Sequence, residues 1–586
     1  MGQKLTGLYV AEIKSRYKDR VYTTFLLRRT YREGGKVKQQ TIANLSALPT
    51  DAIAILRDVL RGHDYVPQEE GLQCVATRAH GHVAAVQAMI DRLGLAKLIA
   101  PEPSSHRDLV LALVTARVVR PLTKLATTRW WQTTTLADES AVADARMEDV
   151  YKALDWLLEQ QERIEKGLAR RHLQEGSMVL YDLSSSYVEG SHCPLAAYGY
   201  SRDRKRGKRQ VNYGVLTDLE GRPVAIEVFA GNIGDPKTVA TQVQKLQGRF
   251  RLGRVVLVGD RGMLTSARIE EFRKIEGIDW VSALRAKEIQ ALAEARCIAP
   301  SMFDERNLAE IVSPQFPGER LVVCRNPLLA AERAHHRQEL LKATEADLAR
   351  LHKRVSNGRL AQPEKIAEAL GRIKNRYKVA KHFDCTIGPR TFSYKRRDDT
   401  MTREAALDGI YVVRTSLPAE ALPANQVVLS YKQLSKVERV FRTLKSDDLR
   451  VRPIHHWTAD RVRAHFLLCM LAYYVEWHLR QAWAPFLFAD EHPGTHADGS
   501  PVAPAQRSPE ADAKASTQRT PDGRPVHSFT TLLADLGTIA ANTMRLPNRP
   551  ETPAFTIVTT PTPFQEDVLQ AVGANLTRAR RQKAPA

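Results

Sequence analysis

Hydrophobic and polar positions follow two different periods in the first third of the chain. Residues 20–32 alternate, Glu-Gly-Gly-Lys at 33–36 has the composition of a turn, and residues 36–44 return as a second strand, so we expect a β-hairpin within residues 1–50. Residues 51–175 instead repeat apolar positions every three or four residues, which predicts a helical domain. Its many Arg and Lys side chains suit either solvated helix faces or a DNA-binding surface.

The pattern changes again at Ser177. Short apolar and β-branched runs bounded by Gly, Asp or Pro predict strands, and these runs cover residues 177–185, 210–218, 222–230, 254–260, 279–284 and 409–416. Residues 285–405 contain two long charged helical patterns around Asn357–Gly358, which predicts an inserted subdomain. Residues 176–284 and 406–485 are then the two parts of one α/β domain with a mixed sheet flanked by helices.

The last hundred residues differ from the rest in composition. Residues 486–528 are rich in Pro, Ala, Asp and Ser and poor in aliphatic side chains, which predicts a flexible linker. Residues 529–586 form a C-terminal region, in which we expect one helix over 530–543, one strand over 554–560 and a basic tail.

The charge of the chain indicates a polyanionic partner. Its 586 residues include 87 Lys and Arg against 66 Asp and Glu, a net charge of +21, and nucleic acid is the simplest partner for such an excess. A basic enzyme that is indifferent to DNA is the alternative. Hydrophobic residues make up 43% of the chain, so a substantial buried core is expected and wholesale disorder is excluded.

Cysteine usage and hydropathy indicate a cytoplasmic protein. The six cysteines are far apart and form no Cys-x-x-Cys pair, which argues against a disulfide framework or a four-cysteine zinc site. The N-terminus has no apolar signal core, and the longest apolar run, 466–475, has roughly half the length that a helix needs to cross a bilayer. We therefore expect no contact with a membrane.

Two acidic residues stand where an acid is costly. Asp182 interrupts the apolar run of residues 178–183, and Asp260 ends the run of residues 255–259. A carboxylate at a buried strand needs a cation or a hydrogen-bond donor. Either residue alone could simply cap the turn after its strand, but together, on adjacent strands, they would meet in one site.

A third acid, Glu438, lies in a helical pattern. Five positions at steps of three and four share one helix face: Tyr431, Leu434, Glu438, Arg442 and Lys445. Val437, Phe441 and Leu444 form the opposite, apolar face. The polar face suits a metal site that meets a phosphate backbone, and the alternative is an ordinary amphipathic helix with an exposed Glu.

These motifs together resemble the DDE transposases of bacterial insertion sequences, in the branch with a Tyr–Arg–Glu–Lys signature. That signature is Tyr, two residues, Arg, three residues, Glu, six residues, Lys; here Tyr431, Glu438 and Lys445 match, and Leu434 replaces the Arg. The Asp182-x-Ser motif, the turn at 231–238 and Val-Gly-Asp-Arg-Gly around Asp260 also resemble the family. The resemblance covers roughly residues 175–285 and 405–480.

The resemblance implies a retroviral-integrase-like (RNase H-like) fold interrupted by a large insertion. It implies that Asp182, Asp260 and Glu438 are the catalytic residues and hold two Mg²⁺ ions, for which Mn²⁺ would substitute. The implied activity is metal-dependent cleavage at the inverted-repeat ends of a transposon and strand transfer into target DNA. Relatives that form a hairpin at the transposon end use a Trp in the insertion, and no Trp occurs between residues 285 and 405.

The DNA contacts implied by the resemblance begin with Tyr431 and Lys445 on the transferred strand. Further candidates are the cations around Glu438 and Asp260 and the basic segment 201–209, which would grip phosphates unless it is only a solvated hairpin tip. The candidate cations are Lys436, Arg439, Arg442, Arg261, Arg202, Arg204, Lys205, Arg206, Lys208 and Arg209. In this family we would expect Arg439 or Arg442 to compensate for Leu434.

The implied partners are double-stranded DNA, both transposon ends and target, and a second copy of the chain, because two ends must be processed together. No small-molecule substrate is expected, and the protein would act in the bacterial cytoplasm at the nucleoid. Two alternatives stay open: an RNase H-like nuclease without strand transfer, and a catalytically inactive, transposase-derived DNA-binding protein.

Overall fold

The computed structural model describes residues 7–18, 20–63, 65, 71–446, 448–492, 500–547 and 553–576. The chain divides into two compact units, which are considered separately. Unit 1 comprises residues 1–77 and 541–559, and unit 2 comprises residues 78–540 and 560–586. None of the helices in the described ranges combines the length and apolar character required to span a bilayer.

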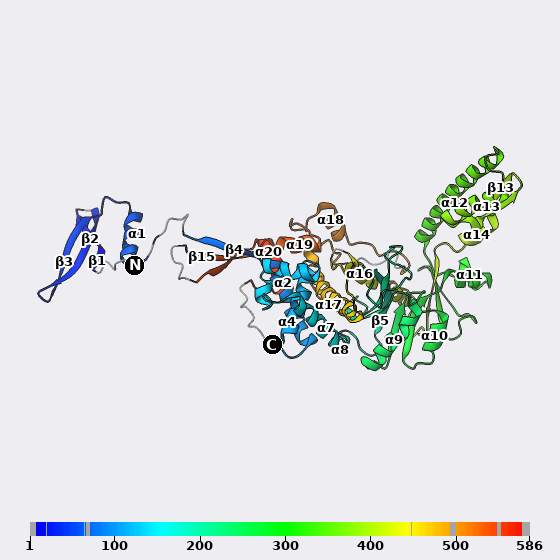
Figure 1. Ribbon diagram of the computed structural model, residues 1–586, viewed down its shortest axis with the longest axis horizontal. Helices are drawn as coiled ribbons and strands as arrows, with labels where there is room; N and C mark the ends of the chain where they lie inside the picture. The colour runs from blue at the N-terminus through cyan, green and yellow to red at the C-terminus, as the bar shows by residue number, and fades with distance from the viewer. Residues whose placement is uncertain are drawn as a thin grey trace. The chain divides into compact units, whose positions relative to one another are not determined.

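Unit 1 contains a three-stranded antiparallel sheet and one helix. Its strands are β1 (Leu8–Tyr17), β2 (Arg20–Glu33) and β3 (Lys36–Asn44), in that order, followed by α1 (Thr50–Leu60) (Figure 1). The turn predicted between β2 and β3 is present, and Gly34 and Gly35 both adopt positive φ there, which favours glycine. The sequence predicted only the hairpin of β2 and β3. The sheet has a further strand, β1, which pairs with β2 along its whole length.

A second sheet in unit 1 joins distant parts of the chain. Its strands are β4 (Gln73–Ala79), β15 (Ala540–Arg545) and β16 (Phe555–Val558), in the order β16-β15-β4. The helix expected over 530–543 was wrong in its second half, because α19 (Phe529–Leu536) ends before Gly537 and the chain continues as β15. Glycine is a poor helix former, which explains the early end.

Unit 2 is built on an eight-stranded mixed sheet in the order β10-β11-β14-β9-β8-β5-β6-β7. Strands β5, β8 and β9 are parallel, and the other pairs are antiparallel. The bounds are β5 Met178–Tyr187, β6 Gln210–Thr217, β7 Pro223–Ala230, β8 Val255–Gly259, β9 Ile278–Ala283, β10 Leu308–Ile311, β11 Arg320–Arg325 and β14 Ile410–Thr415. All six runs predicted as strands from residue 177 to 416 form strands of this sheet.

Helix α17 (Ala459–Ala482) is the buried centre of the helical layer. Helices α4 (Ser105–Val119) and α7 (Met147–Glu159) pack against it, and α4 is buried from Leu109 to Val118. The helical part from residue 78 onward is therefore part of unit 2, not a separate domain over 51–175. The helix expected over 147–173 is divided at Gln160 into α7 and α8 (Gln161–His172).

The remaining helices connect these layers. Their bounds are α2 Gly81–Arg92, α3 Leu95–Ile99, α5 Lys124–Trp130, α6 Leu136–Glu139, α9 Asp235–Gln244, α10 Ser266–Phe272, α11 Ala286–Glu294, α14 Asp398–Ala405, α15 Ala424–Lys432, α16 Leu434–Lys445 and α20 Pro563–Val572.

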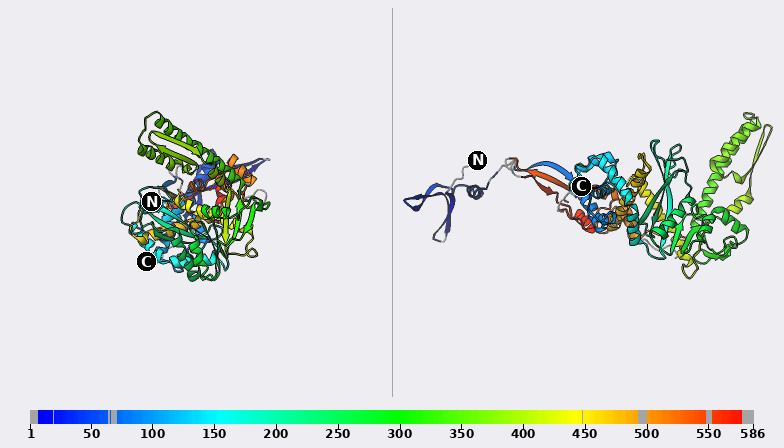
Figure 2. Two further views of the ribbon diagram at one scale, coloured as in Figure 1. Left: turned by 90° about the vertical axis from the view of Figure 1, so that its right-hand side faces the viewer. Right: turned by 60° about the horizontal axis from the view of Figure 1, so that its bottom comes forward.

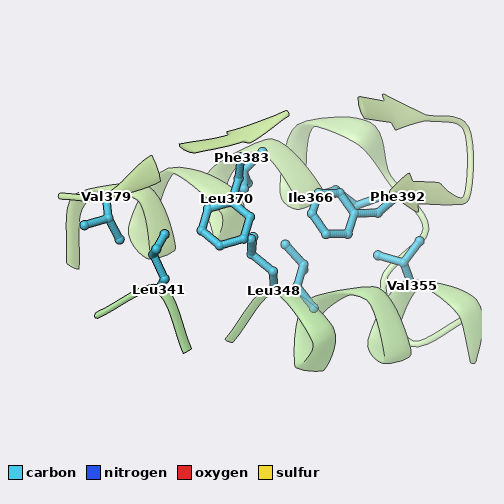
Figure 3. Close-up of a cluster of buried hydrophobic side chains, with 9 residues drawn as sticks. Leu341, Leu348, Val355, Ile366, Leu370, Val379, Phe383 and Phe392 are labelled. Carbon is cyan, nitrogen blue, oxygen red and sulfur yellow. The ribbon is translucent and has the colours of Figure 1, made fainter. Parts of the chain in front are cut away.

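The insertion at 285–405 is only partly a separate subdomain. Its strands β10 and β11 extend the main sheet, which differs from the expectation of a simple interruption. Helices α12 (Pro327–Ser356) and α13 (Pro363–Tyr377) lie side by side away from that sheet and enclose their own apolar cluster with the hairpin of β12 (Phe383–Gly388) and β13 (Thr391–Arg396) (Figure 2, Figure 3). Side chains from all four elements meet there, including Leu348, Ile366, Phe383 and Phe392.

The described part of residues 486–528 has fixed structure, which corrects the expectation of a flexible linker. Helix α18 (Pro509–Thr517) begins at Ser508, whose hydroxyl donates to Asp490 at 2.8 Å. Lys514 pairs with Glu491, and Val502 is buried. Because these are single polar contacts to distant residues, composition alone does not reveal them. Residues 493–499 of the expected linker lie outside the described residues.

Candidate active site

Asp182, Asp260 and Glu438 line one cleft of about 720 Å³ in unit 2. Asp182 lies on β5, Asp260 follows the last residue of β8, and Glu438 lies on α16. Strands β5 and β8 are parallel neighbours in which Tyr181 lies opposite Gly259. Asp182 and Asp260 are the residues that directly follow this pair in the chain. The parallel pairing brings the two carboxylates to adjacent positions, as the pattern of apolar runs predicts.

Helix α16 presents Glu438 through its amphipathic pattern. Val437, Phe441 and Leu444 are buried as expected, and α16 packs against β5. The ring of Phe441 lies edge-on to Tyr213 of β6, with 5.6 Å between the ring centres. This packing leaves Glu438 exposed on the cleft side of the helix.

The single helix expected to carry the whole signature is divided in two. Tyr431 is on α15 and Glu438 is on α16, and the chain turns between the helices at Gln433. Both residues still line the cleft. The Tyr431 hydroxyl donates to Asp260 Oδ1 at 3.3 Å, and burial together with the negative charge of Asp260 raises the Tyr431 pKa well above its usual value. Tyr431 therefore stays protonated and donates a hydrogen bond to the site.

The electrostatics of the cleft favour a bound cation. Burial, together with the negative charges of Asp260 and Glu438, raises the pKa of Asp182 to about 7, although the Leu183 amide and Arg202 oppose the shift. The Leu183 N–H donates to Asp182 Oδ1 at 2.7 Å. A cation among these carboxylates would relieve their mutual repulsion and favour the ionised form of Asp182.

Carboxylate oxygens are the donors that hard divalent ions prefer. In the described part of the chain, however, no three His, Cys, Asp or Glu side chains lie close enough together to hold one metal ion. Among the described residues, the three acids thus share a cleft without being gathered into one three-ligand cluster.

Two of the expected DNA contacts are engaged within the protein. Arg202 Nη2 lies 2.6 Å from both carboxylate oxygens of Asp235, at the start of α9. Lys445 Nζ lies 3.0 Å from Asp203 Oδ1, and the Asp203 side chain is only 1% exposed. Arg452 pairs with the same oxygen. Lys445 thus fastens the basic segment 201–209 to α16.

The other candidate cations differ in whether their charged groups are already bound within the protein. Lys208 and Lys436 form ion pairs with Glu189 and Glu220, at 2.8 Å and 3.1 Å. Arg209 is half-buried and donates to a backbone carbonyl. Six further cations are exposed and form no salt bridge within the described residues: Arg204, Lys205, Arg206, Arg261, Arg439 and Arg442. Segment 201–209 is a loop between β5 and β6, longer than a hairpin tip.

Leu434 lines the cleft at the signature position of the missing Arg. Arg439 and Arg442 are exposed on α16 and are not among the residues that line the cleft, whereas Arg202 and Lys432 are. The expected compensation by Arg439 or Arg442 therefore has no support in the lining of the cleft. Arg202 and Lys432 are the cations among the residues that line the cleft.

The sequence did not reveal part of the cleft wall. The turn motif at 231–238 stands out in the sequence, but the sequence assigns no role to Asp235 within it. No sequence pattern points to Asn326 or Tyr411. Val502 and Pro504 also line the cleft. The Lys432 ammonium donates to the carbonyl of Ala503 at 2.9 Å, and the Asn326 side chain donates to that of Val502 at 3.1 Å, which holds this segment in place.

Comparisons with known proteins agree with this geometry. Residues 174–475 match the family described as the transposase DDE domain, and residues 10–70 match the N-terminal domain of IS1634 family transposases. A solved synaptic complex of piggyBac transposase with hairpin DNA is similar at 10% identity and a TM-score of 0.34, covering 84% of this chain and 82% of that chain. At that score the likeness has no bearing on function. No curated protein matches the chain.

Proposed function

The chain belongs to the DDE transposases of insertion sequences, and on this premise we propose that Asp182, Asp260 and Glu438 are its catalytic residues. It is a DNA transposase, an enzyme that cleaves DNA strands and joins them to other DNA. One observation carries the proposal: the three carboxylates, from β5, the end of β8 and α16, line the same cleft.

The proposed fold of the catalytic part is RNase H-like. Its support is the strand order β7-β6-β5-β8-β9, with β5 to β7 antiparallel and β5, β8 and β9 parallel. The central strand of this set carries Asp182, and its parallel neighbour leads to Asp260. Strands β14, β11 and β10 extend the same sheet beyond β9.

Enzymes of this family use divalent metal ions, and we propose two Mg²⁺ ions, replaceable by Mn²⁺, with Asp182, Asp260 and Glu438 as the ligands. When bound, such ions activate the attacking oxygen and stabilise the leaving oxygen in phosphodiester transfer. The all-oxygen donor set and the raised pKa of Asp182 fit cations. Tyr431 keeps its proton and orients the Asp260 carboxylate by a hydrogen bond.

DNA is the partner of the enzyme, and the cations around the cleft are the proposed contacts to it. Arg204, Lys205 and Arg206 on the basic loop are exposed, and so are Arg439 and Arg442 on α16, so their side chains are available to phosphates. The contact of Tyr431 with the transferred strand stays a prediction. For Lys445 we propose a positioning role, since its ammonium is bound to Asp203. A homodimer is proposed because two ends must be cut together.

The test is Mg²⁺-dependent cleavage of labelled duplexes that carry the terminal inverted repeats of the element encoding the chain. Glu438→Gln removes one carboxylate with little change in size, and Glu220→Gln is the matched control, since Glu220 pairs with Lys436 of the same helix outside the cleft. We expect Glu438→Gln to lower cleavage by more than about 1000-fold while end binding persists, and Glu220→Gln to cleave normally. Near-normal cleavage by Glu438→Gln would exclude the proposed triad.

Joined products measured in the same reactions distinguish transposition from simple hydrolysis. If the wild-type chain cuts but never joins, it is an RNase H-like nuclease without strand transfer. If it binds ends and never cuts, it is a catalytically inactive DNA-binding protein.

A further inference from the structure

The two faces of the β1-β2-β3 sheet in unit 1 are different. Helix α1 packs on one of them, where Glu12 of β1 lies opposite Phe25 of β2. Arg57 of α1 reaches both residues: its guanidinium lies 3.6 Å from the Glu12 carboxylate and 6.0 Å from the centre of the Phe25 ring. We call this side, against which α1 packs, the covered face of the sheet.

The opposite face is open and carries only one sign of charge. Because side chains alternate along a strand, the even-numbered residues of β2 point away from α1 together with their partners on β1 and β3. Arg28 on this face donates to Gln39 of β3 at 3.5 Å. The open-face side chains are Tyr9, Ala11, Ile13, Ser15, Arg20, Tyr22, Thr24, Leu26, Arg28, Thr30, Arg32, Val37, Gln39 and Thr41.

Acids are segregated to the other side. Among the described residues of these strands, the acids are Glu12 and Glu33; Glu12 faces α1, and Glu33 pairs with Lys38 on the same covered face. The open face thus presents Arg20, Arg28 and Arg32 with no carboxylate. It is accessible in part, since Tyr22 is 50% and Val37 is 59% exposed and Arg32 is exposed, whereas Arg28 is half-buried.

We propose that this open face binds double-stranded DNA, with β2 and β3 entering the major groove at the transposon end. Strands are one of the elements that fit this groove, and Arg, Gln and Thr side chains can hydrogen-bond base edges and phosphates. The three arginines, with no carboxylate beside them, complement the polyanion, and the neighbouring amide and hydroxyl groups can hydrogen-bond its bases and phosphates. The inference rests on the proposed function, because it supplies the surface that recognises the DNA on which the triad acts.

The experiment measures binding of the full-length chain to two labelled duplexes, one with the terminal inverted repeat and one with its shuffled sequence. The test variant is Arg28→Ala with Arg32→Ala. The matched control is Arg16→Ala with Arg29→Ala, which removes the same charge from exposed positions on the covered face, one on β1 and one on β2. A third variant, Arg28→Lys with Arg32→Lys, keeps the charge and loses the fork-shaped guanidinium.

We expect the test variant to bind the terminal repeat at least about 10-fold more weakly, and the control to lose less than about 3-fold. The lysine variant should keep binding to the shuffled duplex but lose its preference for the terminal repeat. A thermal unfolding midpoint equal to that of the wild-type chain would confirm that each variant folds.

Equal losses in the test variant and the control would overturn the inference, because general electrostatic attraction would then account for binding. Unchanged binding in the test variant would overturn it as well. In both cases wild-type cleavage at the repeat would leave the catalytic proposal intact. If the wild-type chain fails to prefer the terminal repeat and fails to cut it, the inference and the proposed function both fall.

Discussion

The buried carboxylate of Asp203 should determine how firmly the basic loop is held. Two unit charges about 3 Å apart attract by about 5 kcal/mol at an effective dielectric constant near 20, and desolvation offsets part of this. Removing one member of a buried pair costs about 3–5 kcal/mol. Lys445 and Arg452 keep side-chain exposures of 13% and 29%, so they can be partly rehydrated. We therefore expect Asp203→Asn to lower the free energy of loop opening by about 3 kcal/mol.

Hydrogen–deuterium exchange measured by mass spectrometry on peptides covering 199–212 tests this value. A loss of about 3 kcal/mol corresponds to roughly 100-fold faster exchange of the protected amides. Glu189→Gln is the matched control, since the Lys208–Glu189 pair is exposed at 47% and 37% and solvent screening leaves it little effect on loop opening. Wild-type exchange in Asp203→Asn, or equal acceleration in both variants, would refute the reasoning.

Three further outcomes follow from buried groups in unit 2. Phe441→Ala should destabilise unit 2 by about 3–4 kcal/mol, seen in thermal unfolding, because it leaves a cavity beneath α16, whereas exposed Arg442→Ala should have little effect. Burial raises the Glu476 pKa from 4.5 to about 7, so the free energy of unfolding of the wild-type chain should fall as the pH rises from 4.5 to 7. Glu476→Gln should remove up to about 3 kcal/mol of this fall, measured as the difference in stability between pH 5 and pH 8. A parallel pH dependence in the variant would contradict this. Tyr431→Phe should slow cleavage by roughly 10-fold without loss of fold, because Asp260 loses a hydrogen-bond donor; unchanged rates would exclude that role.

The sheet of unit 2 could be predicted because each of its strands is a short apolar run between turn residues. The same pattern placed Asp182 and Asp260 on neighbouring strands, and the helical period placed Glu438 opposite a buried stripe. By contrast, β1 was missed, since its sequence, LYVAEIKSRY, mixes charged and apolar positions without turn residues on both sides. A half-exposed strand of this kind is recognised only by its partner.

What the sequence could not predict are contacts between polar side chains far apart in the chain. The resemblance alone pointed to Lys445 as a DNA contact, and nothing in the sequence links it to Asp203, which lies in a segment read as basic. Residues 500–504 were predicted to be part of a linker because the surrounding segment is rich in Pro and Ala and poor in aliphatic side chains, yet Asn326 and Lys432 hold its carbonyls against the cleft. Such contacts depend on the finished fold and have no local pattern.

The strand pairing in unit 1 has a consequence for synthesis of the chain. Strand β4 is made early, but its partner β15 and the next strand β16 end only at Val558, so this sheet cannot close until almost the whole chain has left the ribosome. The three-stranded sheet can form as soon as β3 has been synthesised, because β1, β2 and β3 are consecutive in the chain. During translation the nascent chain therefore carries a complete first sheet and a lone β4, and a chain truncated before Ala540 would lack both partners of β4 as well as α20, which packs against α2 and α17.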